Sequence, residues 1–140
     1  MAKELSRAVP EKGSSPPLAA RHKFSRSARL LRHSDFERVY KHGRRHFASR
    51  LTVSYLARPD AGSARIGFTV GKALGGAVQR NRMKRRLREA VRLHLAELQA
   101  AVDIVVNPKK SVLTADFADL ASELSRAFAV VQKSLERRGV

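Results

Sequence analysis

Residues 77–92 of this 140-residue chain carry a dense run of positive charge, with seven Lys or Arg and one acidic residue, Glu89. On a helix, at about 100° per residue, the run separates into two sides. The apolar side holds Met83, Leu87, Ala90, Val91 and His94. The basic side holds Asn81, Lys84, Arg85, Arg88 and Arg92. The first side can pack on a core, and the second needs a polyanion, for which a phosphate backbone is the natural candidate.

Residues 67–73 resemble a phosphate-binding P-loop only superficially. A P-loop has four residues between its glycines and a Ser or Thr after its lysine to hold magnesium. Here three residues separate Gly67 from Gly71, and Ala73 follows Lys72. We therefore expect no nucleotide triphosphatase. Together with Gly75 and Gly76, the segment is better interpreted as a flexible loop that brings backbone N–H groups and Lys72 near a phosphate.

The other residue types that support catalysis or metal binding are sparse. His42 and His46 are four residues apart, but Gly43 lies between them and no further ligands accompany them, so we expect no metal site. The chain has no cysteine, which excludes disulfides and thiolate zinc sites. No Ser-His-Asp set or carboxylate pair stands out. The sequence predicts no catalytic residue in this chain, and a binding subunit rather than a self-sufficient catalyst.

The aromatic residues Phe36 and Tyr40 admit two interpretations. Their spacing of four residues places them on one helix face, which is typical of core packing. The alternative is a stacking platform for unpaired bases. Periodicity alone favours the core.

The composition indicates an anionic partner. Net charge is +17, from 29 Lys and Arg against 12 Asp and Glu, and such an imbalance opposes compaction unless a partner neutralises it. Nucleic acid is the leading candidate, and an acidic membrane surface is second. The basic helix lacks Trp or Phe on its apolar side, which argues against the membrane. With no apolar run long enough for a secretory signal or a membrane span, we expect a cytoplasmic protein without a membrane partner or a small-molecule substrate.

The chain divides into an arm and one domain. Residues 1–27 contain Pro10 and a run of glycine, serine and proline at 13–17, and we expect a disordered basic arm there. Residues 28–140 form the domain. Its expected elements are a helix from a Ser34–Glu37 capping box to Gly43, strands at 51–56 and 65–70, the basic helix at 79–98, a strand at 103–108, and a helix after Thr114.

This order, α-β-β-α-β-α, predicts a single-domain, two-layer α+β sandwich in which strands 51–56 and 65–70 form an antiparallel hairpin. A further strand at 45–47 is weakly signalled. The core face of the hairpin is formed by Leu51, Val53, Tyr55, Ile66, Phe68 and Val70. The other face carries the small residues Thr52, Ser54, Gly67, Thr69 and Gly71. Beside the helix that bears Phe36 and Tyr40, this second face predicts a shallow groove.

Four stretches of the sequence resemble the bacterial ribonuclease P protein subunit. They are residues 30–43, 65–72, 75–89 and 103–106. The most specific part is the Arg-Asn-Arg triplet at 80–82, followed by Lys-Arg at 84–85 and Leu-Arg-Glu at 87–89. The resemblance spans about residues 28–135 in matching order and spacing.

The resemblance implies a subunit of a ribonucleoprotein endonuclease that removes the 5′ leader from precursor tRNA. The catalytic site would then lie in the RNA subunit, with Mg²⁺ held mainly by that RNA and the substrate. About one protein per catalytic RNA would bind the RNA and the leader, which broadens substrate use and lowers the magnesium demand. It also implies a mixed sheet with an unusual left-handed βαβ crossover, like the second domain of ribosomal protein S5.

The resemblance also assigns residues to two binding surfaces. The surface for the RNA subunit would contain Lys72, Arg80, Asn81, Arg82, Lys84, Arg85 and Arg88. The surface for the precursor-tRNA leader would contain Phe36, Tyr40, Thr52, Ser54 and Thr69, which favours the platform over the core for the aromatic pair. The chain departs from the family pattern at Ser54, Ala73, Gly76, Asn107 and Pro108.

One alternative shares the charge and the expected fold. A ribosomal or generic structural RNA-binding protein would carry the same basic helix, and only the identity of the RNA partner separates the two.

Overall fold

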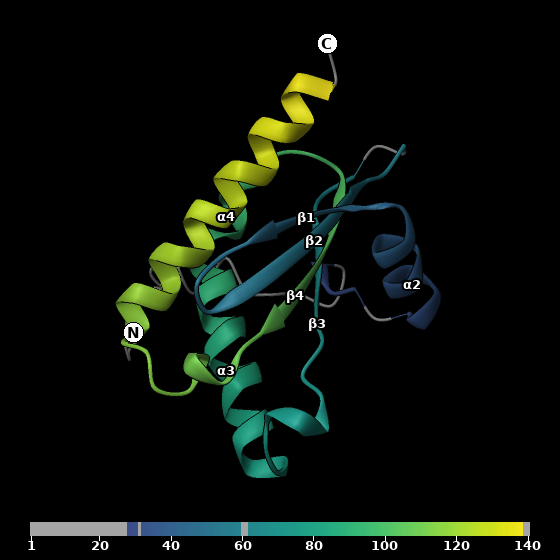
Figure 1. The fold of residues 1–140 in the computed structure, drawn as a ribbon. Coiled ribbons are helices and arrows are strands. Elements are labelled where there is room, and N and C mark those ends of the chain that lie inside the picture. The colour runs from purple at the N-terminus through teal and green to yellow at the C-terminus, as the bar shows by residue number, and fades with distance from the viewer. Residues whose placement is uncertain (1–27, 31, 60–61, 139–140) are drawn as a thin grey trace, which may run out of the picture.

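The structure is a computed structural model that describes residues 28–30, 32–59 and 62–138 (Figure 1). Its helices and strands are α2 (His33–His42), β1 (Arg44–Phe47), β2 (Leu51–Ala57), β3 (Arg65–Phe68), α3 (Ala77–His94), β4 (Val102–Pro108) and α4 (Phe117–Arg138). Short 3₁₀ turns lie at Lys72–Leu74, Leu95–Glu97 and Lys110–Val112. The arm predicted at 1–27 lies outside the described residues. Within the described part, no helix has the length and apolar character to cross a membrane.

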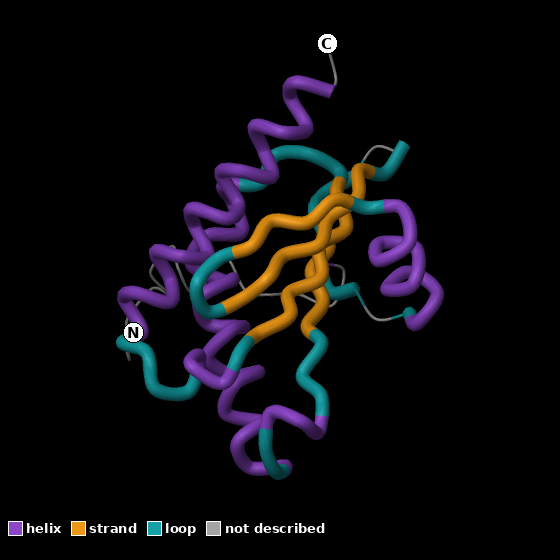
Figure 2. The backbone as a smooth tube through the Cα atoms, in the orientation of Figure 1, coloured by secondary structure: helices purple, strands orange, loops and turns teal. Residues whose placement is uncertain are grey.

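Four strands form one mixed sheet in the order β1-β2-β4-β3 (Figure 2). β2 is antiparallel to both β1 and β4, and β3 is parallel to β4. The predicted hairpin between 51–56 and 65–70 is therefore wrong, because β4 lies between the two strands. Residues 102–106 are all buried, and a strand buried on both faces belongs in the middle of a sheet. The weakly signalled strand at 45–47 is confirmed as β1.

Helices cover both faces of the sheet, where the sequence predicted one helical layer. α3 and α4 lie on one face and α2 on the other (Figure 1). The predicted core face of β2 and β3 is confirmed, since Leu51, Val53 and Ile66 pack with apolar side chains of α3 and α4. A smaller cluster under α2 contains Leu30, Val39 and Val105, with Phe36 and Leu56 against it. The α+β class and mixed sheet are confirmed, while the left hand of the β3–α3–β4 connection and the likeness to ribosomal protein S5 stay predictions.

The ends of α2 differ from the expected capping. Arg32 stands at the N-cap without a side-chain hydrogen bond, so the capping box at Ser34 is wrong. Glu37 instead lies 3.5 Å from the Nε2 atom of His33. Gly43 ends the helix as predicted, but its backbone is extended. Glycine is needed there for a close approach, because a Cβ would lie 2.5 Å from the carbonyl oxygens of Val39 and Tyr55.

The basic helix α3 begins two residues earlier and ends four residues earlier than predicted, with the 3₁₀ turn at Leu95–Glu97 following it. Its apolar side is confirmed for Met83, Leu87, Ala90 and Val91, which are fully buried. His94, predicted on the same side, is only half-buried, and its Nδ1 atom lies 2.6 Å from a carboxylate oxygen of Glu97. Gly75 precedes it at φ 137°, a conformation that L side chains rarely adopt. That turn redirects the chain from β3 into α3. The last helix is confirmed as α4, with Asp116 rather than Thr114 directly before its first residue.

Candidate nucleic-acid interface

A groove of about 460 Å³ runs between α2, the end of β3 and α3. Its lining comes from segments far apart in the sequence: His33, Phe36, Glu37, Tyr40, Phe68, Thr69, Val70, Gly71 and Lys84. Aromatic and aliphatic side chains form much of the wall, and polar groups stand among them. Three of the five residues predicted for leader binding therefore meet here: Phe36, Tyr40 and Thr69.

Phe36 lies in the groove because β3 has no side chain at Gly67. A Cβ built on Gly67 would come within 2.4 Å of the Phe36 ring and 3.0 Å of the Leu30 carbonyl oxygen. The ring is half-buried and packs against the small cluster under α2. Phe36 thus packs on the sheet with part of its ring and lines the groove with the rest.

Tyr40 is held over the sheet by its hydroxyl group. That group donates a hydrogen bond to Oδ1 of Asn107 at 2.9 Å and lies 2.6 Å from Oγ1 of Thr69. A phenol has one proton, so the Thr69 hydroxyl donates in the second bond. The Tyr40 side chain remains 37% exposed. Its ring therefore has a fixed position and a face open to the groove.

Thr52 and Ser54 lie outside the groove lining. Thr52 pairs with Asn107 in the β2–β4 register and is half-buried. Ser54 is only 1% exposed, and its hydroxyl has no hydrogen-bond partner among the described residues. The predicted groove floor is wrong for Ser54, because α2 packs over that part of the sheet through Val39 and buries it.

The basic side of α3 adjoins the groove through Lys84. Asn81, Arg82, Arg85 and Arg88 are exposed. Within the described part of the chain, no carboxylate pairs with Arg82, Lys84, Arg85 or Arg88. Arg80 is half-buried and donates from Nε to the Gly75 carbonyl oxygen at 3.2 Å. Lys72 is exposed on the preceding 3₁₀ turn, so the residues predicted for the RNA subunit lie along one helix and the loop before it.

Two other basic residues of α3 are used within the fold. Arg86 donates to the carbonyl oxygen of Ala115, and Arg92 pairs with Glu89. Arg92 therefore differs from the other members of the predicted basic side, because a neighbouring carboxylate compensates its charge.

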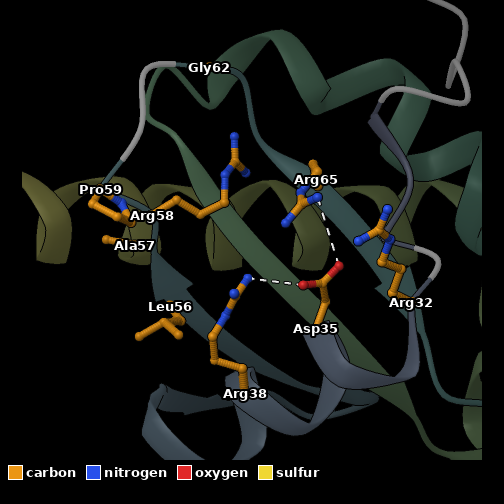
Figure 3. A pocket seen from close by; sticks show the side chains of 9 residues that line it. All are labelled: Arg32, Asp35, Arg38, Leu56, Ala57, Arg58, Pro59, Gly62 and Arg65. Carbon is orange, nitrogen blue, oxygen red and sulfur yellow. Dashed lines mark hydrogen bonds and ion pairs between the residues drawn. The ribbon is translucent and has the colours of Figure 1, made fainter.

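A second pocket, of about 770 Å³, lies beside α2 and is lined by four arginines: Arg32, Arg38, Arg58 and Arg65 (Figure 3). Asp35 stands between two of them, with its carboxylate oxygens 3.1 Å from Arg38 and 3.8 Å from Arg65. Part of this charge is compensated inside the fold, because three of these arginines also hold a second carboxylate, that of Asp103.

Asp103 is a fully buried carboxylate at the start of β4. Arg65 donates two hydrogen bonds to it at 2.8 Å, Arg58 donates one at 2.9 Å and Arg38 one at 3.0 Å. Burial by itself raises the pKa of Asp103, but the hydrogen bonds and charges of Arg65 and Arg58 outweigh it and lower the pKa below its usual value.

The bond between Arg38 and Asp103 ties α2 to the centre of the sheet. Sequence patterns did not predict this cluster, and its only local signal is an acidic residue opening an otherwise apolar strand. Together with the Tyr40 hydroxyl, the ion pair fixes how α2 lies on the sheet. It therefore positions both aromatic side chains of the groove.

The described residues offer no metal centre. No group of three or more His, Asp or Glu side chains among them could hold an ion. Asp35 and Asp103 face arginines rather than open space. The donor set of this part of the chain does not fit a Mg²⁺ ion bound by protein ligands alone.

Comparison with known proteins identifies a common family. A family model described as Ribonuclease P matches residues 24–132. The ribonuclease P protein component of Acidothermus cellulolyticus is 41% identical over 113 residues, covering 79% of this chain and 93% of the relative. That of Gluconacetobacter diazotrophicus is 41% identical over 102 residues, covering 72% and 88%.

Solved structures agree with this match. The RNase P protein of Staphylococcus aureus superimposes with a TM-score of 0.66 at 27% identity, covering 75% of this chain and 95% of that one. The RNase P protein of Thermotoga maritima gives a TM-score of 0.65 at 27% identity, covering 71% and 94%. The similarity extends over both the sequence and the fold of the described domain.

Proposed function

The chain belongs to the ribonuclease P protein family, and from this premise we propose how it divides its work between two RNA molecules. It is a protein subunit of ribonuclease P, an endoribonuclease complex of tRNA 5′ processing, and it functions with an RNA subunit. Family membership favours this role over a ribosomal or generic structural RNA-binding protein.

The chemistry, in this proposal, belongs to the RNA subunit. That RNA and the precursor tRNA supply the Mg²⁺ sites for hydrolysis of the phosphodiester. This chain holds the two polyanions together, with about one protein per RNA in the cytoplasm. The proposal draws support from its net charge of +17 and from the scarcity of carboxylates that could act as protein ligands.

α3 binds the RNA subunit through its exposed basic side. Arg82, Arg85 and Arg88 have no carboxylate partner within the described chain, so a phosphate backbone can take their charge without first breaking an ion pair. Each phosphate that such a residue neutralises releases condensed counterions, which favours binding at low salt. Arg80, Asn81, Lys84 and Lys72 extend this surface along the helix and the loop before it.

The groove beside α2 binds the single-stranded 5′ leader. Unpaired bases can stack on Phe36 and Tyr40, and such stacking contributes about 1–3 kcal/mol per base. Thr69 lines the same groove and is a polar neighbour of these two rings. The main support for this proposal is the position of Lys84, which lines the groove and also belongs to the basic helix α3. One continuous surface thus serves the leader and the catalytic RNA.

Cleavage at low magnesium tests this function. The RNA subunit is incubated with precursor tRNA at limiting Mg²⁺, with and without this chain, and the release of the 5′ leader is followed. We expect the chain to raise the cleavage rate and to shift the Mg²⁺ requirement downward. An equal rate and requirement with and without the chain would contradict the proposed role.

A further inference from the structure

Phe47, on the outer strand β1, is a large hydrophobic side chain that lies outside the groove lining. It is 71% exposed, and Val78 is equally exposed on α3. An aromatic ring in water on a sheet face loses the stabilisation that burial would give it. Phe47 packs in neither hydrophobic cluster of the described residues.

The strand register places Phe47 in line with the groove. Phe47 pairs with Thr52, and Thr52 pairs with Asn107. The Thr69 backbone N–H donates to Val106, which continues the row onto the end of β3. Because neighbouring strands lie about 4.8 Å apart, Phe47 lies about 10 Å from Asn107 and about 15 Å from Thr69. Tyr40 contacts this same row through its hydroxyl group.

Side chains alternate along a strand, so this row points to the face covered by α2 rather than to the main core. Thr52 and Asn107 are half-buried and small, and neither blocks the path from Tyr40 to Phe47 with a large side chain. The row therefore connects the leader groove to an exposed aromatic ring at the sheet edge.

The charge around Phe47 favours a nucleic acid over an apolar partner. Arg45 is exposed two residues earlier on the same strand and face, and Arg44 beside it is also exposed. Lys109 and Lys110 are exposed directly after β4, at the same end of the sheet. β1 itself carries no acidic residue. A base can stack on the ring while the phosphates next to it meet these positive charges.

We propose that Phe47 is a second stacking site for the precursor's leader, which takes an unpaired base beyond the nucleotides in the groove. The inference rests on the proposed function of the groove. It extends the leader track across the sheet from Phe36 and Tyr40, past Thr52, to Phe47. Chains of this family without an aromatic residue at this position would lack the added stacking site.

Tryptophan fluorescence tests this stacking directly, because the chain contains no tryptophan. Phe47→Trp therefore introduces a single emission probe into the holoenzyme. Two precursors are compared: one with a long leader, and one cut to the shortest leader whose affinity still responds to Tyr40→Ala. We expect the emission to change only with the long leader. Val78→Trp, at an equally exposed position on α3, is the matched control and should not respond to leader length.

Affinity gives the second readout. Phe47→Ala should weaken binding of the long-leader precursor by about fivefold to tenfold, the lower part of the range for one stacked base. Binding of the short-leader precursor should not change, and Phe47→Tyr should restore the affinity.

Three results would overturn the proposal: no loss of affinity with Phe47→Ala, an equal loss for both leader lengths, or an emission change when the RNA subunit alone is added. The last result would assign Phe47 to the catalytic RNA. A selective loss with Tyr40→Ala but none with Phe47→Ala would reject this inference and leave the groove intact. No dependence on a leader in either variant would reject the proposed function itself.

Discussion

At the scale of single residues, Phe36 and Tyr40 show why one spacing supported two interpretations. Four-residue spacing places both on one helix face, but it does not say how that helix is rolled on the sheet. The absence of a side chain at Gly67 and the bond from Arg38 to Asp103 set that roll. Each ring then packs with one part and faces the groove with another. Core packing alone and a stacking platform alone are therefore both incomplete descriptions of these residues.

Removing the Tyr40 hydroxyl separates anchoring from stacking. Tyr40→Phe keeps the ring and loses the hydrogen bonds to Thr69 and Asn107. We expect the free energy of unfolding to fall by about 0.5–1.5 kcal/mol for each of the two hydrogen bonds lost. Leader affinity should fall less than in Tyr40→Ala. Urea unfolding and precursor binding measure the two effects, and a loss of leader affinity as large as that of Tyr40→Ala would argue against stacking.

Asp103 predicts a specific acid sensitivity. Its pKa is lowered in the folded state, so its contribution to stability is complete above the unfolded pKa of about 3.9 and is lost as the pH falls through the folded pKa. Asp103→Asn should cost about 3–5 kcal/mol near neutral pH, because the arginines around it lose their partner. The difference from the wild-type chain should shrink below about pH 4.

Urea unfolding across pH 2–7, roughly the window of carboxylate titration, measures this effect. Asp119→Asn, at an exposed position in the first turn of α4, is the control. Its carboxylate interacts with the helix dipole, so its difference from the wild-type chain should stay below about 1 kcal/mol. A difference between the wild-type chain and Asp103→Asn that stays constant with pH would show that the charge of Asp103 is not the cause.

At the scale of elements, side-chain periodicity predicted which face of a helix or strand is buried, but it did not predict which strands pair with each other. The buried side of α3 and the core face of β2 and β3 follow from side-chain spacing alone, and both are confirmed. The hairpin was wrong because strand pairing is a long-range property, and β4 is drawn between β2 and β3 by burial on both of its faces. The Ser34 capping box failed because the helix begins at His33, two residues earlier than a cap at Ser34 requires.

The same limit applies to the binding surface. The basic side of α3 could be predicted, since one helix carries it. The groove could be predicted only in part, because it needs the relative placement of α2, β3 and α3. Asn107 and Asp103 position groove residues from β4, far away in sequence, and no local pattern indicates either role.

The basic side of α3 should govern how assembly depends on salt. Arg82→Ala and Arg85→Ala should each weaken binding of the RNA subunit, and the slope of log K against log salt should flatten by about 0.7–0.9 for each phosphate that is no longer neutralised. Arg126→Ala removes the same charge from an exposed position on α4 and should leave the slope nearly unchanged. Binding titrations at several salt concentrations decide the matter, and unchanged slopes in both α3 variants would remove the role assigned to this helix.

At the scale of the whole molecule, the fold places two RNA-binding surfaces on one small domain. α3 packs its apolar side on the main core and leaves its basic side exposed. α2 lies on the opposite face of the sheet (Figure 1). Lys84 joins the two surfaces at the groove. The net charge of +17 alone indicates a polyanion partner. The motif around residues 80–89 and the relatives at 41% identity indicate which complex it serves.

Leader discrimination by the assembled holoenzyme measures whether the groove beside α2 holds the leader. Equilibrium affinities for precursor tRNA and for mature tRNA are measured with the wild-type chain, with Phe36→Ala and with Tyr40→Ala. We expect both variants to bind the precursor more weakly, by about 1–3 kcal/mol for each base that no longer stacks, while affinity for mature tRNA stays the same. An equal decrease for both RNAs, or no decrease for either, would contradict the claim that the groove beside α2 holds the leader.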